Sequence, residues 1–112
     1  NNGLIINILD ERILRRVSTF GAYSVSKAAL AHLTELSAME WGETIRVNGI
    51  SPGLILPPVG TSNKYLLQNA PNISTKTHGN VSDILRGLDY LIDSPFVNGE
   101  ILFIDGGKSK KQ

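Results

Sequence analysis

The chain has 112 residues, of which 41% are hydrophobic and 19% are charged, and its formal net charge is +1. These values are typical of a soluble globular domain and give no support for nucleic acid or an anionic membrane as a partner. Lys108, Lys110 and Lys111 are interpreted as a solvated tail. Cysteine is absent, which excludes disulfides and thiolate chemistry and is compatible with a cytoplasmic location. Neither His32 nor His78 has metal-ligand spacing around it, so we expect no metal site.

The chain starts abruptly with the polar residues Asn1 and Asn2. No apolar run is long enough for a membrane helix, and no basic segment precedes one as in a signal peptide. We therefore expect this sequence to begin inside a longer protein.

The first predicted element is a strand over residues 4–9, LIINIL, which is almost continuously apolar. Such a run is typical of a strand covered on both faces, as in a parallel sheet. Asp10 ends the strand. Residues 11–21 are predicted to form a loop in which Ser18 or Thr19 caps the following helix.

A long helix is predicted over residues 22–41, and Gly42 ends it. Apolar side chains surround most of this helix, whereas packing on a sheet requires only one apolar stripe. The additional coverage indicates a second buried side. We therefore expect a homodimer or homotetramer that forms through the 22–41 helix.

A second strand is predicted over residues 44–50, TIRVNGI, and the Ser-Pro-Gly sequence at 51–53 halts it. Residues 54–80 are rich in Pro, Asn, Ser and Thr, which predicts a long irregular loop with a short helix near 64–69. Loops of this length in compact domains usually carry function.

A helix over residues 82–94, capped by Ser82, and a strand over residues 100–107 complete the predicted elements. Strands that alternate with helices predict an α/β fold, a doubly wound parallel sheet with three strands and two main helices in this chain. Ligands bind beyond the carboxyl ends of such strands. One of these ends is Asp10.

Tyr23 and Lys27 are the first candidates for chemistry, because four residues on a helix separate two side chains on one face. An ammonium group favours the phenolate, so we expect Lys27 to lower the pKa of Tyr23 and make it a usable acid or base. A strand-end acid such as Asp10 beside this pair is what a proton-handling site requires.

Three segments together resemble the short-chain dehydrogenase/reductase family, in the family's order and spacing. They are YSVSK at 23–27, IRVNGISPG at 45–53 and VNGEILFIDGG at 97–107. The resemblance covers essentially the whole chain. It implies that residues 1–112 are the C-terminal half of one Rossmann-like domain.

The resemblance implies a role for each matching residue. Tyr23 corresponds to the general acid that exchanges a proton as hydride moves to or from a nicotinamide, and Lys27 to the lysine that binds the nicotinamide ribose. Pro52, Gly53 and Leu54 correspond to the stretch against the nicotinamide ring. The missing side chain of Gly53 permits close approach there.

One position departs from most of the family, which carries a serine thirteen residues before the tyrosine. This chain has Asp10 there, and pteridine reductases, a branch of the family, are similar in having aspartate. A carboxylate can hydrogen-bond pterin nitrogens and relay protons to Tyr23, so we expect reduction of a dihydropterin or related pteridine. General carbonyl or alcohol oxidoreduction stays open, as does a register in which Ser18 or Thr19 takes the serine's role.

The loop over residues 54–80 is the expected substrate loop. Ile55 stands where a pteridine reductase tends to offer a small polar residue, so the family's contacts in this loop are not carried over. On position alone, Leu56 and Pro57 are candidates for lining the substrate pocket together with Leu54.

The Gly-rich turn that holds the cofactor pyrophosphate in this family is absent from the sequence. The N-terminal half of the domain is therefore expected to lie outside this chain. NADPH is the expected cofactor because the resembling reductases use it. Two hypotheses stay open: these residues belong to an intact reductase, or they form a catalytically inactive fragment that dimerises through its apolar helix.

Overall fold

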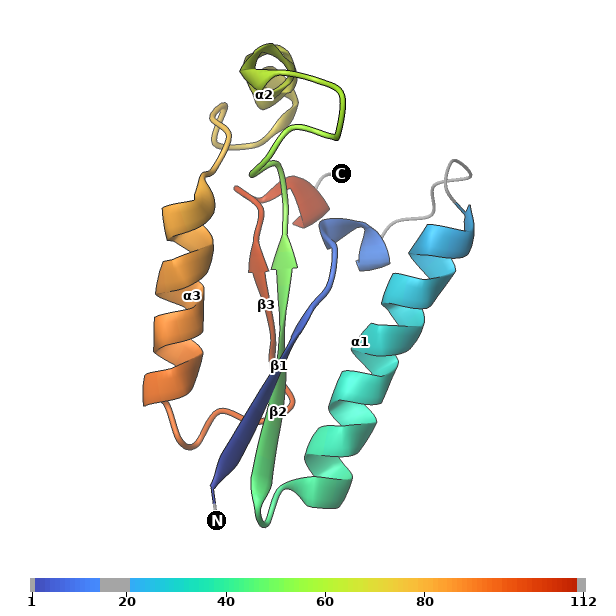
Figure 1. Cartoon of the computed structure of the whole chain (residues 1–112), viewed down its shortest axis with the longest axis vertical. Coiled ribbons are helices and arrows are strands. Elements are labelled where there is room, and N and C mark those ends of the chain that lie inside the picture. The colour runs from blue at the N-terminus through green and yellow to red at the C-terminus, as the bar shows by residue number, and fades with distance from the viewer. Residues whose placement is uncertain (1, 15–20, 111–112) are drawn as a thin grey trace.

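A computed structural model describes residues 2–14 and 21–110 of the protein. Three parallel strands form one sheet in the order β1-β2-β3, with a long helix against each face (Figure 1). A short helix stands beyond the carboxyl ends of the strands. The helices and strands are β1 (Gly3–Ile8), α1 (Gly21–Trp41), β2 (Ile45–Pro52), α2 (Asn63–Asn69), α3 (Val81–Asp93) and β3 (Ile101–Ile104). The predicted α/β architecture with three strands and two main helices is confirmed.

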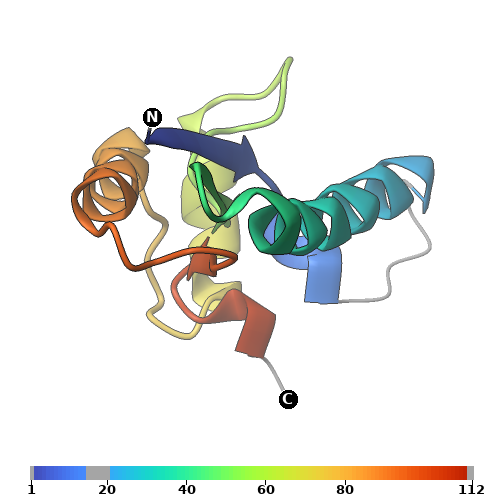
Figure 2. The same cartoon turned by 90° about the horizontal axis from the view of Figure 1, so that it is seen from below.

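The central strand β2 is the most deeply buried element. It pairs with β1 from Gly3↔Ile45 to Ile8↔Ile50 and with β3 at its carboxyl half. Helices α1 and α3 cover opposite faces of the sheet, as the view from below shows (Figure 2). This three-layer arrangement fits the almost continuously apolar sequence at 4–9.

The strand β2 is longer than predicted, because it continues through the Ser-Pro sequence that was expected to halt it. Pro52 lacks a backbone N–H, yet the ladder continues past it, since the Gly53 N–H donates to the Ile104 carbonyl at 2.9 Å. A proline at the last position of a strand therefore removes no hydrogen bond that the neighbouring strand needs.

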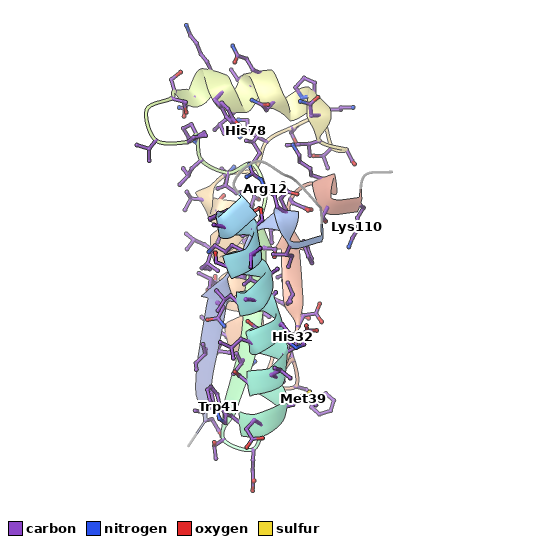
Figure 3. All side chains as sticks on the ribbon, turned by 90° about the vertical axis from the view of Figure 1, so that its right-hand side faces the viewer. Arg12, His32, Met39, Trp41, His78 and Lys110 are labelled. Atoms are coloured by element: carbon purple, nitrogen blue, oxygen red, sulfur yellow. The ribbon has the colours of Figure 1, made fainter. Side chains whose placement is uncertain are left out.

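Helix α1 packs on the sheet through small residues, which let the helix approach closely. Its buried residues are Ala31, Thr34, Ser37 and Ala38. Large apolar side chains point away from the sheet instead, and Met39 and Trp41 are seen along this side in Figure 3. The exposed fractions are 69% for Val25, 54% for Leu33, 48% for Leu36, 81% for Met39 and 46% for Trp41.

A polar contact between Asn7 and Thr34 joins β1 to the middle of α1. The Asn7 side-chain amide donates to Thr34 Oγ1 at 2.9 Å, and the Thr34 hydroxyl donates to the Leu30 carbonyl at 2.8 Å. Thr34 is fully buried. This contact fixes α1 along the direction of β1, three residues before Asp10.

The start of α3 differs from the prediction. The helix begins at Val81, and its cap is Asn80 rather than Ser82. The Asn80 side chain accepts from the Ser82 N–H at 3.0 Å, while the Asp83 carboxylate accepts from the Asn80 N–H at 2.8 Å. This reciprocal pair satisfies two N–H groups at the helix start, which a cap at Ser82 cannot do.

Two other boundaries complete the comparison with the sequence. Residues Glu11–Leu14 form a short 3-10 turn, η1, inside the predicted loop, and the proposed caps Ser18 and Thr19 lie outside the described residues. The last strand ends at Ile104, and a second 3-10 turn, η3, spans Lys108–Lys110. Among the helices described, none combines the length and apolar character that a membrane crossing requires.

Candidate functional site

The carboxyl end of β1 brings Asp10 to the first turn of α1. The Tyr23 hydroxyl donates a hydrogen bond to Asp10 Oδ2 at 2.8 Å, and the Arg12 backbone N–H donates to Asp10 Oδ1 at 2.9 Å. Both carboxylate oxygens therefore have a fixed partner. The structure thus brings together two of the three residues that the sequence suggested for proton transfer.

Lys27 lies on the same face of α1 as Tyr23, as their spacing predicted. Its ammonium is 5.8 Å from the centroid of the Tyr23 ring and donates to the Ile8 carbonyl at 2.9 Å. Lys27 therefore donates to the last residue of β1 and not to the phenol oxygen. The side chains of Asp10, Tyr23 and Lys27 lie together at the carboxyl end of this strand.

The pKa of Tyr23 is raised above its ordinary value of 10.0, so the prediction of a lowered pKa is wrong for this structure. The largest cause is the loss of water around the hydroxyl, followed by the hydrogen bond to Asp10 and the negative charge of that carboxylate. The Arg12 guanidinium opposes these effects. At neutral pH Tyr23 is therefore an un-ionised phenol with a proton to give.

Asp10 also opens onto a pocket of about 180 Å³ at the carboxyl edge of the sheet. Of the residues predicted for the cofactor and substrate, the pocket contains Pro52, Gly53, Leu54 and Leu56. Pro57 does not line it, whereas the next residue does. The remaining lining residues are Glu11, Arg12, Pro58, Tyr65, Asn69 and Lys108. Tyr23 and Lys27 lie outside the lining, and the Tyr23 hydroxyl contacts it through Asp10.

Six of the lining residues were missed by the sequence analysis, and three of them come from elements late in the chain. Tyr65 and Asn69 come from α2, and the Asn69 amide donates to the Tyr65 carbonyl at 2.8 Å, which holds the two together. Lys108 comes from η3 and was interpreted as part of a solvated tail. The only available signal was position: α2 lies in the predicted substrate loop, and Lys108 comes shortly after the end of β3 at Ile104.

The requirement for glycine at Gly53 has an internal cause in this structure. A Cβ atom at this position would lie 2.7 Å from both Cα and Cβ of Asp105, on the chain that follows β3. Real Cβ atoms essentially never approach so closely. The glycine therefore lets β2 and β3 leave the sheet side by side.

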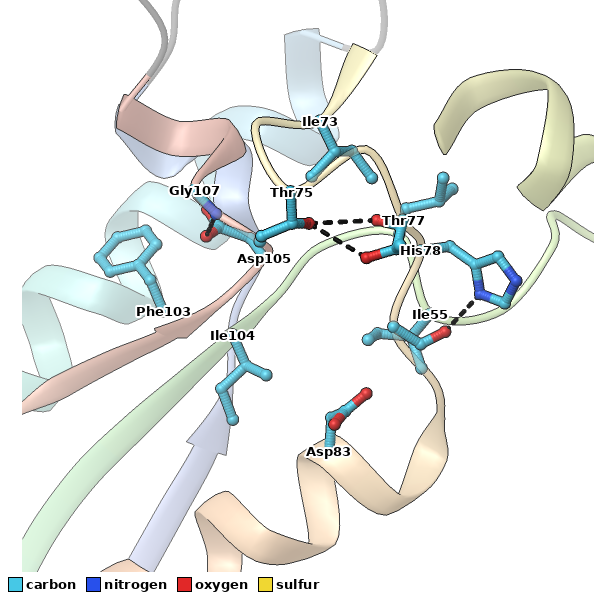
Figure 4. Close-up of a pocket in the computed structure, with 13 residues that line it drawn as sticks. Ile55, Ile73, Thr75, Thr77, His78, Asp83, Phe103, Ile104, Asp105 and Gly107 are labelled. Atoms are coloured by element: carbon cyan, nitrogen blue, oxygen red, sulfur yellow. Dashed lines mark hydrogen bonds between the residues drawn. The ribbon is translucent and has the colours of Figure 1, made fainter. Parts of the chain in front are cut away.

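A second cavity, of about 320 Å³, lies near the start of α3 and is drawn in Figure 4. Its polar groups already have partners: Asp105 accepts from the Gly107 N–H at 3.0 Å, and His78 Nδ1 bonds the Gly79 carbonyl at 2.6 Å. The Asp83 carboxylate caps α3, and the backbone N–H that it accepts is the largest cause of its lowered pKa. These groups stabilise the loop, and Asp10 is not part of this cavity.

Comparison with known proteins identifies the relationship. Residues 1–109 match the family model described as enoyl-(acyl carrier protein) reductase, one of the short-chain dehydrogenase/reductase models. The chain belongs to the short-chain dehydrogenase/reductase family. The family that the motifs resemble is thereby confirmed.

Several short-chain dehydrogenase/reductases are similar to this chain. Dihydromonapterin reductases from Citrobacter koseri and an Escherichia coli O6 strain are 33% and 34% identical over 104 residues, which is 93% of this chain and 43% of each relative. The crystal structure of FolM alternative dihydrofolate reductase 1 from Brucella canis, complexed with NADP, has a TM-score of 0.90 at 27% identity. That match covers 100% of this chain and 44% of the other.

A 4-hydroxyisoleucine dehydrogenase mutant, complexed with NADH and succinate, is also similar. Its structure is 38% identical, with a TM-score of 0.87, and the match covers 99% of this chain and 49% of that protein. The chain therefore spans less than half the length of the short-chain dehydrogenase/reductases that it matches.

Proposed function

We propose that the protein carrying this chain is an NADPH-dependent reductase of a dihydropterin or related pteridine, with Tyr23 as proton donor. The observation that carries the proposal is the 2.8 Å hydrogen bond from the Tyr23 hydroxyl to Asp10. Similarity to dihydromonapterin reductases, and to a FolM protein complexed with NADP, supports both the substrate class and the cofactor.

Asp10 suits a pterin because the pterin ring presents N–H donors, and a carboxylate only accepts. Among the described residues, each oxygen of Asp10 accepts one hydrogen bond, which leaves further lone pairs for a ring. The carboxylate lies on the pocket wall as well as against Tyr23. A single group thus orients the ring and touches the proton donor.

Tyr23 suits the donation of a proton to the substrate, and Lys27 suits the binding of the cofactor ribose. NADPH supplies the hydride when bound, and the raised pKa of Tyr23 keeps the phenol protonated for donation. The Lys27 ammonium has three N–H donors and uses one on the Ile8 carbonyl. Two donors therefore remain for ribose hydroxyls, so the residues present fit the cofactor.

The alternative function is oxidoreduction of a carbonyl or an alcohol. It is favoured by the 38% identity to 4-hydroxyisoleucine dehydrogenase, which exceeds the identity to the dihydromonapterin reductases. Such a substrate needs one donor at its oxygen, and a carboxylate at Asp10 offers none when ionised.

Turnover of the protein at its natural length tests the proposal. We expect NADPH oxidation, followed at about 340 nm, with a dihydropterin, and a loss of about 10²- to 10⁴-fold in kcat for Tyr23→Phe. Tyr90→Phe on α3, which removes a 52% exposed phenol from the opposite face, is the matched control and leaves kcat unchanged. Turnover of simple ketones or hydroxy amino acids without pterin turnover decides for the alternative, and Asp10→Ser then raises activity.

The homo-oligomer, the cytoplasmic location and the intact enzyme stay predictions. The exposed apolar side of α1, from Val25 to Trp41, supports a second copy of the chain on this helix. Intact mass of the purified protein distinguishes the two forms: a species near 12.1 kDa is the inactive fragment, and about twice that mass is the reductase.

A further inference from the structure

We propose that Lys108 makes this site select dihydropterins whose side chain is anionic, as in folates, over those with a neutral side chain. The inference rests on the proposed function and concerns the same pocket. It starts from the observation that a lysine of the C-terminal turn lines the wall of the pocket that holds Asp10.

The backbone of Lys108 is held on both sides. Asp105, which is only 8% exposed, accepts from the Gly107 N–H at 3.0 Å and from the Ser109 N–H at 2.9 Å. The Lys108 N–H itself donates to the Asp105 carbonyl at 3.2 Å. A buried carboxylate therefore fixes the turn from which Lys108 reaches the pocket.

The charges of the pocket are unevenly placed. Asp10 accepts hydrogen bonds from the Tyr23 hydroxyl and the Arg12 N–H, and Glu11 is only 6% exposed, although both acids line the pocket. Lys108 is partly exposed, and within residues 2–14 and 21–110 its ammonium has no ion pair. Arg12 lines the same wall. The lining of the pocket therefore contains a hydrogen-bond acceptor at Asp10 and a positive charge at Lys108.

A substrate that matches this arrangement has hydrogen-bond donors at one end and a negative charge at the other. A dihydropterin with a carboxylate-bearing side chain has both, and its ring donors face Asp10 while a carboxylate pairs with Lys108. Because the ammonium is partly exposed, we expect the pair to change affinity by about five- to tenfold, between the values for surface pairs and for buried charged hydrogen bonds.

Lys110 provides a matched control on the same turn. Its ammonium lies 5.0 Å from the centroid of the Phe103 ring, and it does not line the pocket. Lys108→Gln and Lys110→Gln remove the same charge from neighbouring positions. A difference between the two variants therefore reports on the pocket and not on the overall charge.

The experiment compares dihydrofolate with dihydromonapterin in the protein at its natural length. For Lys108→Gln we expect KM for dihydrofolate to rise about five- to tenfold with kcat unchanged, and KM for dihydromonapterin to stay within twofold. Lys108→Arg restores most of the loss, and Lys110→Gln behaves as the parent. Equal effects on both substrates, or none on dihydrofolate, overturn the inference.

Binding of folate, followed by quenching of protein fluorescence, gives a readout without turnover. Weaker folate binding in Lys108→Gln alone supports the inference, whereas equal binding in all variants, or none in the parent, overturns it. If the parent protein turns over neither pterin, the proposed function is wrong, and the folate titration still decides the role of Lys108.

Discussion

The hydrogen bond between Asn7 and Thr34 leads to a prediction that can be worked out from the structure. Thr34→Val replaces a fully buried hydroxyl by a methyl group of similar size. The Leu30 carbonyl keeps its helical partner, so it is not left unpaired. The Asn7 amide, by contrast, loses its 2.9 Å acceptor.

The expected cost follows from this one unpaired donor. A partly buried amide without an acceptor costs about 1–2 kcal/mol, and the added methyl group offsets only part of it. For a domain near this size, a loss of about 1–2 kcal/mol lowers Tm by about 5–10 °C. Replacing both partners, Asn7→Leu with Thr34→Val, leaves no polar group unpaired and costs less than Thr34→Val alone.

A double-mutant cycle by urea unfolding measures the coupling between the two residues. We expect the double variant to be at least about 1 kcal/mol more stable than the sum of the single effects predicts. Additive effects of Asn7→Leu and Thr34→Val would show that the contact does not hold α1 against β1. The alignment of Asp10 with Tyr23 would then need another cause.

Three further changes test other parts of the fold. Gly53→Ala brings a Cβ within 2.7 Å of the chain after β3 and should lower the free energy of unfolding by about 1–3 kcal/mol. Gly21→Ala, where a Cβ meets nothing within 4 Å, is the control and should not destabilise the protein. Thermal unfolding compares the two variants. The lowered pKa of Asp83 adds stability above about pH 3.8 that is lost as pH falls through the folded pKa, so Asp83→Asn should flatten the acid side of a urea-midpoint profile. Asp10→Asn removes the negative charge that helps to raise the pKa of Tyr23, so the phenol should titrate at lower pH by ultraviolet absorbance, and an unchanged titration contradicts this.

The sequence was most informative where a local pattern determines the structure. The apolar run at 4–9 and the long helix at 22–41 were predicted almost to the residue, because strand burial and helix spacing act within a few residues. The end of β2 was not predicted correctly. Pro52 is tolerated there because the Gly53 N–H donates a hydrogen bond to the neighbouring strand β3. That bond joins residues about fifty positions apart, which no local pattern contains.

The candidate site shows the same division. Asp10, Tyr23 and Lys27 could be proposed because motif spacing identifies them, but the direction of the Tyr23 pKa shift was predicted wrongly. Helical spacing indicated that the Lys27 ammonium would lower the pKa of the Tyr23 phenol. In the structure Lys27 donates to the Ile8 carbonyl, and the Asp10 carboxylate accepts a hydrogen bond from the phenol. Lys108 was missed because its place depends on the turn that Asp105 caps. Hydrogen bonds between residues of different elements, rather than residue type alone, determine where these side chains lie.

The charge at Asp10 also bears on the direction of the reaction. Oxidation of an alcohol needs Tyr23 as a phenolate that accepts a proton, and a carboxylate that hydrogen-bonds the phenol opposes that ionisation. Reduction needs the neutral phenol, which the same carboxylate favours. A serine at this position would bring no charge and would not oppose the ionisation of Tyr23. The aspartate in place of serine therefore supports the proposed reductase over the alternative dehydrogenase, whatever the ring of the substrate is.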